Sequence, residues 1–305
     1  MKKISSFMLA CAMAVTALTP SGAVAVSEEE LPIMYLTVTE NEKISIMPSG
    51  DVYINSSELT EDTAMRVNIY VRDEAKNLWN VAPKVKSESS YIAFSEDATD
   101  PTDVGENSAY QPKYDFIQSV DDECNTVNIK LSTPMMSSSD TVLTPTGDST
   151  DDFPVAYFNA SVDSDIPSGK YRIYFLTEAE DYDGQQTTTV SSILYDTTTP
   201  KVKEQRILVS DRKLGDVNND GNIDSVDASM VLGEYSKISS GGEKSFDESM
   251  NIASDINTDM RLDTVDASQI LAYYSYSSRI PEGETCMSIF EYLKSGVIGV
   301  SGTEE

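Results

Sequence analysis

The chain has 305 residues, with 51 acidic against 22 basic side chains, no histidine and a formal net charge of −29 at pH 7. A negative field of this strength disfavours nucleic acid and anionic membranes as partners and favours cations. The absence of histidine excludes Ser-His-Asp and Cys-His nucleophile systems in their usual form, and His-ligated zinc or iron sites. Carboxylate chemistry and oxygen-ligated metals remain.

The first 25 residues predict a secretory signal peptide. Lys2 and Lys3 precede an apolar stretch from 7 to 18, and Ala23-Val24-Ala25 forms an A-x-A cleavage site. The apolar stretch is too short to span a bilayer. We therefore expect an exported, extracellular chain. A competing interpretation makes Cys11 a lipid-anchored cysteine, but it leaves a very short apolar core.

Residues 26–210 predict a mainly β domain, an Ig-like or cohesin-like sandwich. Short segments rich in β-branched and aromatic residues are separated by polar turns, and several alternate apolar with polar residues, as around Val67, Ile69 and Val71. No segment sustains a helical period for three turns, which favours two packed sheets. The expected strands include 33–39, 65–72, 90–94, 126–131, 155–162, 171–177 and 187–195.

Two long acidic loops, 95–112 and 137–152, are expected to be either solvated or binding loops. Cys124 and Cys286 are expected in different domains, as small buried side chains rather than as a disulfide.

A duplicated unit follows a change of composition near residue 210. Residues 214–236 and 253–275 are identical at 11 of 23 aligned positions, and each copy predicts a loop running into a short amphipathic helix. The loops are residues 216–227 and 255–266. Oxygen-bearing side chains occupy loop positions 1, 3, 5, 9 and 12, where alternate residues of a tightly curled loop converge on one hard cation.

This spacing matches the EF-hand calcium loop, except that position 12 is Asp in both copies, and it predicts two Ca²⁺ ions. The expected metal site comprises Asp216, Asn218, Asp220, Asn222, Asp224 and Asp227 in the first loop, and Asp255, Asn257, Asp259, Arg261, Asp263 and Asp266 in the second. Asn222, at position 7, would contribute only its backbone carbonyl. Met260 replaces Gly221 at position 6, where a positive φ is needed, so the second site should be weaker. Ile223 and Leu262 are expected to pair and tie the loops together.

The two loops, with Val-Asp-Ala-Ser shared at their ends, resemble dockerins of the type I kind found in cellulosome assemblies, over residues 214–293. The resemblance implies a small all-α module that needs calcium to fold and docks on the cohesin domain of a scaffoldin. By position it implies a largely apolar partner-binding surface made of Ser225, Val226, Leu232, Gly233, Thr264, Val265, Leu271 and Ala272. The alternative is that Leu232 and Leu271 simply face the core of the module.

Two segments depart from that resemblance. Residues 237–254 predict a long polar connector between the copies, and 284–293 predict a further helix, with Met287, Phe290 and Leu293 at helical spacing. Residues 294–305 are expected to be a tail.

Three hypotheses stay open for the front domain, and no catalytic residue is nominated. Residues 155–176 and 66–94, the latter with Trp79 in a loop, resemble cohesin strands and imply a non-catalytic adaptor that binds another dockerin. A carbohydrate-binding module for plant polysaccharide would use exposed aromatics among Tyr110, Tyr114, Tyr157, Tyr182 and Tyr195. A glycoside hydrolase would need two carboxylates about 5 to 9 Å apart, which so acidic a sequence does not single out.

Overall fold

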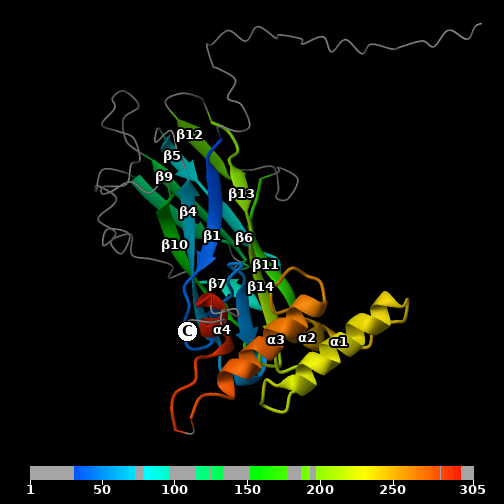
Figure 1. The fold of residues 1–305 in the computed structure, drawn as a ribbon. Helices are drawn as coiled ribbons and strands as arrows, with labels where there is room; N and C mark the ends of the chain where they lie inside the picture. Colours follow the sequence, from blue (N-terminus) through cyan, green and yellow to red (C-terminus); the bar gives the residue numbers. More distant parts are fainter. Residues whose placement is uncertain are drawn as a thin grey trace, which may run out of the picture.

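The structure, a computed structural model, consists of a β-rich front domain followed by a smaller helical module (Figure 1). It describes residues 31–72, 78–95, 115–121, 123, 125–132, 152–177, 187–192, 197–281 and 283–296. The predicted signal peptide, Cys124 and nearly all of the loops 95–112 and 137–152 lie outside the described residues. So do Tyr110, Tyr114, Tyr182 and Tyr195.

Two sheets make up the described part of the front domain. The strands are β1 (Ile33–Val38), β2 (Ile44–Ile46), β3 (Val52–Asn55), β4 (Thr63–Arg72), β5 (Leu78–Ala82), β6 (Lys84–Ser87), β7 (Ile92–Phe94), β8 (Asp115–Val120), β9 (Thr126–Ser132), β10 (Asp152–Val162), β11 (Gly169–Phe175), β12 (Thr189–Ser192), β13 (Lys201–Lys203) and β14 (Gln205–Ser210). One sheet has the order β13-β1-β4-β10-β7. The other has the order β12-β5-β9-β6-β11-β14-β3-β2, with β8 paired to β9.

The sheets share one apolar core, so the front domain is a sandwich. In β4 the alternate side chains Met65, Val67, Ile69 and Val71 are all fully buried, because successive residues of a strand point to opposite faces. They belong to the same cluster as Val85, Ile173 and Ile207 of the other sheet. The prediction of a mainly β front domain is confirmed, and each segment predicted as a strand contains one.

The placement of Trp79 in a loop was wrong. Trp79 lies in β5, which pairs with β9 and β12, and β6 follows directly after Pro83. The segment between β4 and β7 therefore holds two strands rather than one loop. Both are only four or five residues long, too short for alternation to distinguish them from loop sequence.

In the described residues that follow β14 the helices are α1 (Ser225–Ser239), α2 (Glu248–Ser254), α3 (Thr264–Ser277) and α4 (Ile289–Lys294). Helices α1 and α3 begin with capping boxes, in which Asp224 and Asp263 are the N-caps and Asp227 and Asp266 reach back to the cap backbone. Helix α4 confirms a helix near the C-terminus, but it begins at Ile289 rather than within 284–288, so Met287 lies before it. Within the described part of the chain, no helix combines the length and apolar character needed to cross a bilayer.

The connector between the copies is more ordered than predicted. Helix α1 extends to Ser239, and α2 occupies residues that the sequence assigned to a polar connector. The buried carboxylate of Glu234 accepts hydrogen bonds from the backbone N–H groups of Ser245 and Phe246 and from the Ser245 hydroxyl, and so fixes the chain before α2. Asp247 then caps α2.

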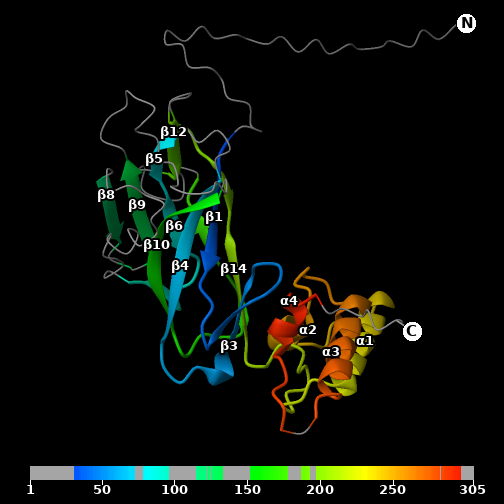
Figure 2. The same ribbon diagram turned by 60° about the vertical axis from the view of Figure 1, so that its left-hand side comes forward.

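The module packs directly on the front domain (Figure 2). Met47, Tyr53 and Leu208 from the sandwich join the apolar core of the module, which includes Val217, Val231, Ile252, Ile270 and Ile289. The Tyr53 ring lies 5.5 Å from that of Phe290, and its hydroxyl donates to the carbonyl of Arg212. The sandwich and the module are thus joined by a shared apolar contact as well as by the chain.

Candidate metal centres

The first loop, residues 216–227, curls around its own acidic side chains. Asp216 accepts hydrogen bonds from the backbone N–H groups of Asp220 and Gly221 at 3.0 and 2.9 Å. Asp227 accepts three more, from Val217, Asn218 and Asp224, at 2.9 to 3.1 Å. The carboxylates at positions 1 and 12 are therefore brought to the inside of the loop.

The second loop, residues 255–266, repeats this arrangement with one difference. Asp266 accepts from the N–H groups of Ile256 and Asp263, both at 2.9 Å, and Asp255 Oδ2 accepts from that of Met260 at 3.0 Å. The other oxygen of Asp255, Oδ1, is buried and accepts no hydrogen bond of normal geometry. A buried carboxylate oxygen without a donor is a position that a cation would satisfy.

The inner carboxylates of both loops are buried. Asp216, Asp227 and Asp266 are at most 1% exposed, and Asp255 is 6% exposed. Burial raises the pKa of Asp227, and it raises those of Asp255 and Asp266 to about 6, since the charged form is poorly solvated there. In each loop, other carboxylates add repulsion. A bound cation would relieve both the desolvation and the repulsion.

The residues present fit a calcium ion. Carboxylate, amide and backbone carbonyl oxygens are the ligands that Ca²⁺ takes, and each loop offers all three kinds. Within the described residues no group of three or more His, Cys, Asp or Glu side chains is already gathered as a metal cluster. In each loop, two of the six expected ligands are of other kinds: one is an Asn side chain and one is a backbone carbonyl. Ile223 and Leu262, expected to tie the loops together, both lie half-buried against the core of the module.

The two loops differ in the residues that adopt positive φ. In the first loop these are Asn219 (φ 59°) and Gly221 (φ 90°), types that enter this region most readily. In the second they are Thr258 (φ 57°) and Met260 (φ 64°), as expected for position 6. Such a backbone costs roughly 1 to 2 kcal/mol per residue with a Cβ. The second loop is therefore the more strained.

The helices that follow the loops carry the predicted partner-binding residues on exposed surface. Val226 and Leu232 of α1 are 51% and 40% exposed, and Val265 and Leu271 of α3 are 47% and 41% exposed. Ser225, Gly233 and Thr264 are also exposed, and Ala272 is half-buried. The alternative that Leu232 and Leu271 face the core is wrong, because Val231 and Ile270 fill that position.

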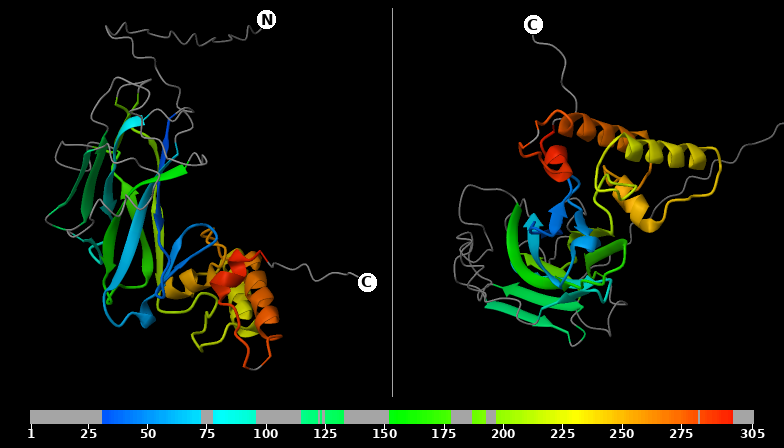
Figure 3. Two further views of the ribbon diagram at one scale, coloured as in Figure 1. Left: turned by 90° about the vertical axis from the view of Figure 1, so that its left-hand side faces the viewer. Right: turned by 90° about the horizontal axis from the view of Figure 1, so that it is seen from below.

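Helices α1 and α3 lie on the side of the module away from the sandwich, with α2 and α4 between them and the strands (Figure 3). Packing of the module on the front domain thus leaves the outer faces of α1 and α3 uncovered. Exposed Tyr235 and Tyr274, at matching places in the two copies, were not predicted and widen this apolar surface.

Other predicted residues have different surroundings. Tyr157, considered for sugar stacking, is 7% exposed with the Arg66 guanidinium 3.6 Å from its ring centroid. Cys286 is a free thiol, half-exposed rather than buried. The sequence did not indicate two contacts between the front domain and the module: the Thr258 hydroxyl donates to Ser49 Oγ, and the Tyr53 hydroxyl donates to the carbonyl of Arg212. One signal was available for Tyr53: Val52-Tyr53-Ile54 is a continuous apolar run, which is typical of a strand covered on both faces.

Comparison with known families matches residues 214–273 to the model of the dockerin type I domain. The C-terminal module is a dockerin. The match covers both loops, α1, α2 and the first ten residues of α3, and it ends before α4. Comparison with the curated proteins finds no match.

Among solved structures, the chain is similar to several cohesins. A type III cohesin module from a cell-surface anchoring scaffoldin of Ruminococcus flavefaciens matches at 12% identity and a TM-score of 0.40, over 65% of this chain and 99% of that one. A type II cohesin domain from the cellulosome of Acetivibrio cellulolyticus matches at 11% and 0.38, over 58% and 95%. A cohesin module from a family 33 glycoside hydrolase of Clostridium perfringens matches at 8% and 0.34, over 58% and 96%. TM-scores this low decide neither the fold nor the function of the front domain.

Proposed function

We propose that this protein is an exported, non-catalytic adaptor of a cellulosome-type, polysaccharide-degrading complex. Its dockerin binds two Ca²⁺ ions and docks on a cohesin of a scaffoldin, while the front sandwich binds another protein in the manner of a cohesin. The observation that carries the proposal is the dockerin match over residues 214–273, together with the exposed outer faces of α1 and α3.

The calcium loops would act by holding the docking helices. Asp227 and Asp266 serve both as position 12 of a loop and as the N3 residue of a helix capping box, so a cation bound there fixes the start of α1 and of α3. Ala228 and Ala267, one residue later, are buried where the helices pack. Calcium binding would thereby set the spacing of the two outer faces.

The proposed docking surface carries large, partly exposed apolar side chains. Val226, Leu232 and Tyr235 on α1, and their counterparts Val265, Leu271 and Tyr274 on α3, leave large side chains partly in water. Exposed apolar groups of this kind are typical of protein interaction surfaces. Since α1 and α3 present matching residues, either helix could provide the leading contact.

The test is binding of the full chain to a panel of immobilised cohesins, with calcium and after chelation. We expect calcium-dependent capture. If the helices are interchangeable, Leu232→Ala and Leu271→Ala should each weaken binding less than 3-fold, and the double variant by roughly 30-fold or more, as for an interface hot spot. Val202→Ala, which alters an exposed apolar residue of the sandwich, is the matched control and should change nothing. A large loss from either single variant would contradict interchangeability, and no capture by any cohesin would contradict docking.

The front domain is tested in the same double variant. Its weakened dockerin should compete less with the offered dockerins for a binding site on the sandwich. It is offered a panel of dockerins and of insoluble polysaccharides while released sugar is measured. Capture of a dockerin is expected. Retention on polysaccharide, or sugar release, would instead make the front domain a carbohydrate-binding or catalytic unit.

A further inference from the structure

The duplicated loops have unequal surroundings, although their ligand positions match. Thr258 of the second loop is 4% exposed, whereas its counterpart Asn219 in the first loop is exposed. Asp255, Thr258 and Met260 line a cavity of about 130 Å³ whose other wall belongs to the sandwich and includes Lys170 and Leu208. The second loop is therefore covered by the front domain at a place where the first is open to solvent.

A chain of hydrogen bonds ties the second loop to the sandwich. The Thr258 hydroxyl donates to Ser49 Oγ at 2.7 Å, and the Ser49 hydroxyl donates to Asp51 Oδ2 at 2.9 Å. Asp51 is buried and paired with Arg206, whose Nη2 lies 2.6 Å from the same oxygen. Ser49 lies in the turn between β2 and β3. The backbone N–H of Met47 donates a hydrogen bond to the carbonyl of Asp51 and closes this turn. Thr258 is thus anchored to a fixed part of the front domain.

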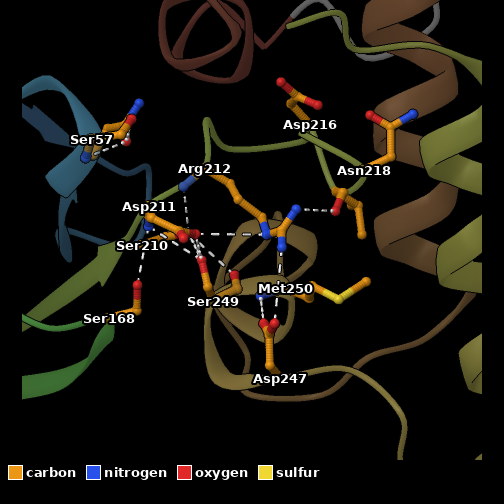
Figure 4. Close-up of polar contacts among 12 residues, drawn as sticks. Ser57, Ser168, Ser210, Asp211, Arg212, Asp216, Asn218, Asp247, Ser249 and Met250 are labelled. Carbon is orange, nitrogen blue, oxygen red and sulfur yellow. Dashed lines mark hydrogen bonds and ion pairs between the residues drawn. The ribbon is translucent and has the colours of Figure 1, made fainter. Parts of the chain in front are cut away.

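A second contact joins the helix that precedes the loop to the sandwich. Ser210, at the end of β14, and Ser249, in α2, lie 2.8 Å apart through their hydroxyl groups (Figure 4). Ser249 also donates to the carboxylate of Asp211, whose backbone N–H donates to Ser168 of the sandwich. Helix α2 ends at Ser254, so this contact holds the helix that leads directly into Asp255.

These contacts hold the loop in a conformation that its own sequence disfavours. Thr258 is β-branched and Met260 is unbranched but bulky, and both adopt the left-handed backbone that Asn219 and Gly221 adopt readily in the first loop. A strained backbone persists where the surrounding structure determines it. Here the surroundings that differ between the copies are those of the front domain.

We propose that the front domain is a structural part of the second calcium site. Ser49 and the contact between Ser210 and Ser249 hold residues 255–266 ready for the ion, so the sandwich raises the calcium affinity of this loop. By linkage, calcium in this loop fastens the dockerin to the sandwich. The inference rests on the proposed function of the two loops as calcium sites.

The test is a calcium titration of the full chain by calorimetry, comparing the parent with Ser49→Ala. We expect two sites in the parent and a 5- to 20-fold loss of affinity at one of them in the variant. Ser57→Ala, an exposed serine of the same domain whose hydroxyl bonds only locally to Asn55, is the matched control and should leave both affinities unchanged. Asp216→Asn and Asp255→Asn identify the sites: Ser49→Ala should weaken the remaining site in the first background and leave it unchanged in the second.

Hydrogen exchange gives an independent readout. Amides of residues 44–54 should exchange more slowly when calcium is added, and Asp255→Asn should abolish this response while Asp216→Asn preserves it. Unchanged affinities in Ser49→Ala, or no calcium response at 44–54, would overturn the inference while leaving two calcium sites intact. A parent chain that binds calcium only in its first loop would overturn it too. A parent that binds no calcium would overturn the calcium sites themselves.

Discussion

The loops 216–227 and 255–266 share their four acidic positions and the Asn at position 3, but they differ in the residues that adopt positive φ. The first is locally self-consistent, since Asn219 and Gly221 suit positive φ and their side-chain positions are open to solvent. The second places Thr258 and Met260 in the same conformation and lies against the sandwich. In the second copy, contacts with the neighbouring domain thus take the place of residues that favour positive φ.

Removing calcium from both loops should have the largest effect. Since the ion would bind only the folded loops, its removal costs about 4 kcal/mol per site at a concentration a thousandfold above the dissociation constant. We expect chelation to abolish the helical circular dichroism and expose residues 214–293 to protease, while the sandwich stays intact. Re-adding calcium should restore both signals. Unchanged dichroism and unchanged protease resistance would contradict the calcium sites.

Removing one carboxylate at position 12 should have the next largest effect and should differ between the copies. Asp227 accepts hydrogen bonds of normal geometry from three backbone N–H groups, whereas Asp266 accepts two such bonds and a weaker contact from the N–H of Asn257, all in buried surroundings. Asp227→Ala should therefore destabilise the dockerin by about 2 to 4 kcal/mol, and Asp266→Ala by somewhat less, because fewer donors lose their acceptor. Urea unfolding followed by circular dichroism measures both.

The matched controls are Asp227→Asn and Asp266→Asn, which keep an acceptor oxygen and remove the charge. They should lose one calcium equivalent each, and in saturating calcium they should lose less stability than the Ala variants. Equal losses of stability for the Asn and Ala variants in saturating calcium would show that charge rather than hydrogen bonding holds the helix starts.

The elements that the sequence predicted well are those specified by nearby residues. The spacing of Asp216, Asn218 and Asp220 places the loop without knowledge of any distant contact, and the alternation around Val67 places β4. The exposed faces of α1 and α3 followed from the resemblance to dockerins. The loop and the strand were predictable because each pattern lies within one short segment.

The elements that the sequence did not predict depend on residues far apart. Tyr53 donates to the carbonyl of Arg212, 159 positions away, and Thr258 donates to Ser49, 209 positions away. No periodicity in one segment indicates such a pairing. Helix α2 has seven residues, too few to show a helical period, and its anchor Ser249 resembles any other polar residue of a connector.

Exchanging the residue at position 6 should have the smallest effect and a different sign in the two copies. Met260 is 64% exposed, so Met260→Gly loses little packing and relieves the left-handed strain, partly offset by the entropy of glycine. We expect a gain of about 0.5 to 1 kcal/mol in stability and a few-fold tighter second site. Gly221→Ala should lose about 1 kcal/mol. A Cβ at Gly221 meets no atom within 4 Å, so that loss would come from the backbone alone. Calcium titration and thermal unfolding of both variants measure the pair. Changes of the same sign would mean that position 6 is not what separates the copies, and the weakness of the second loop would then lie at Thr258.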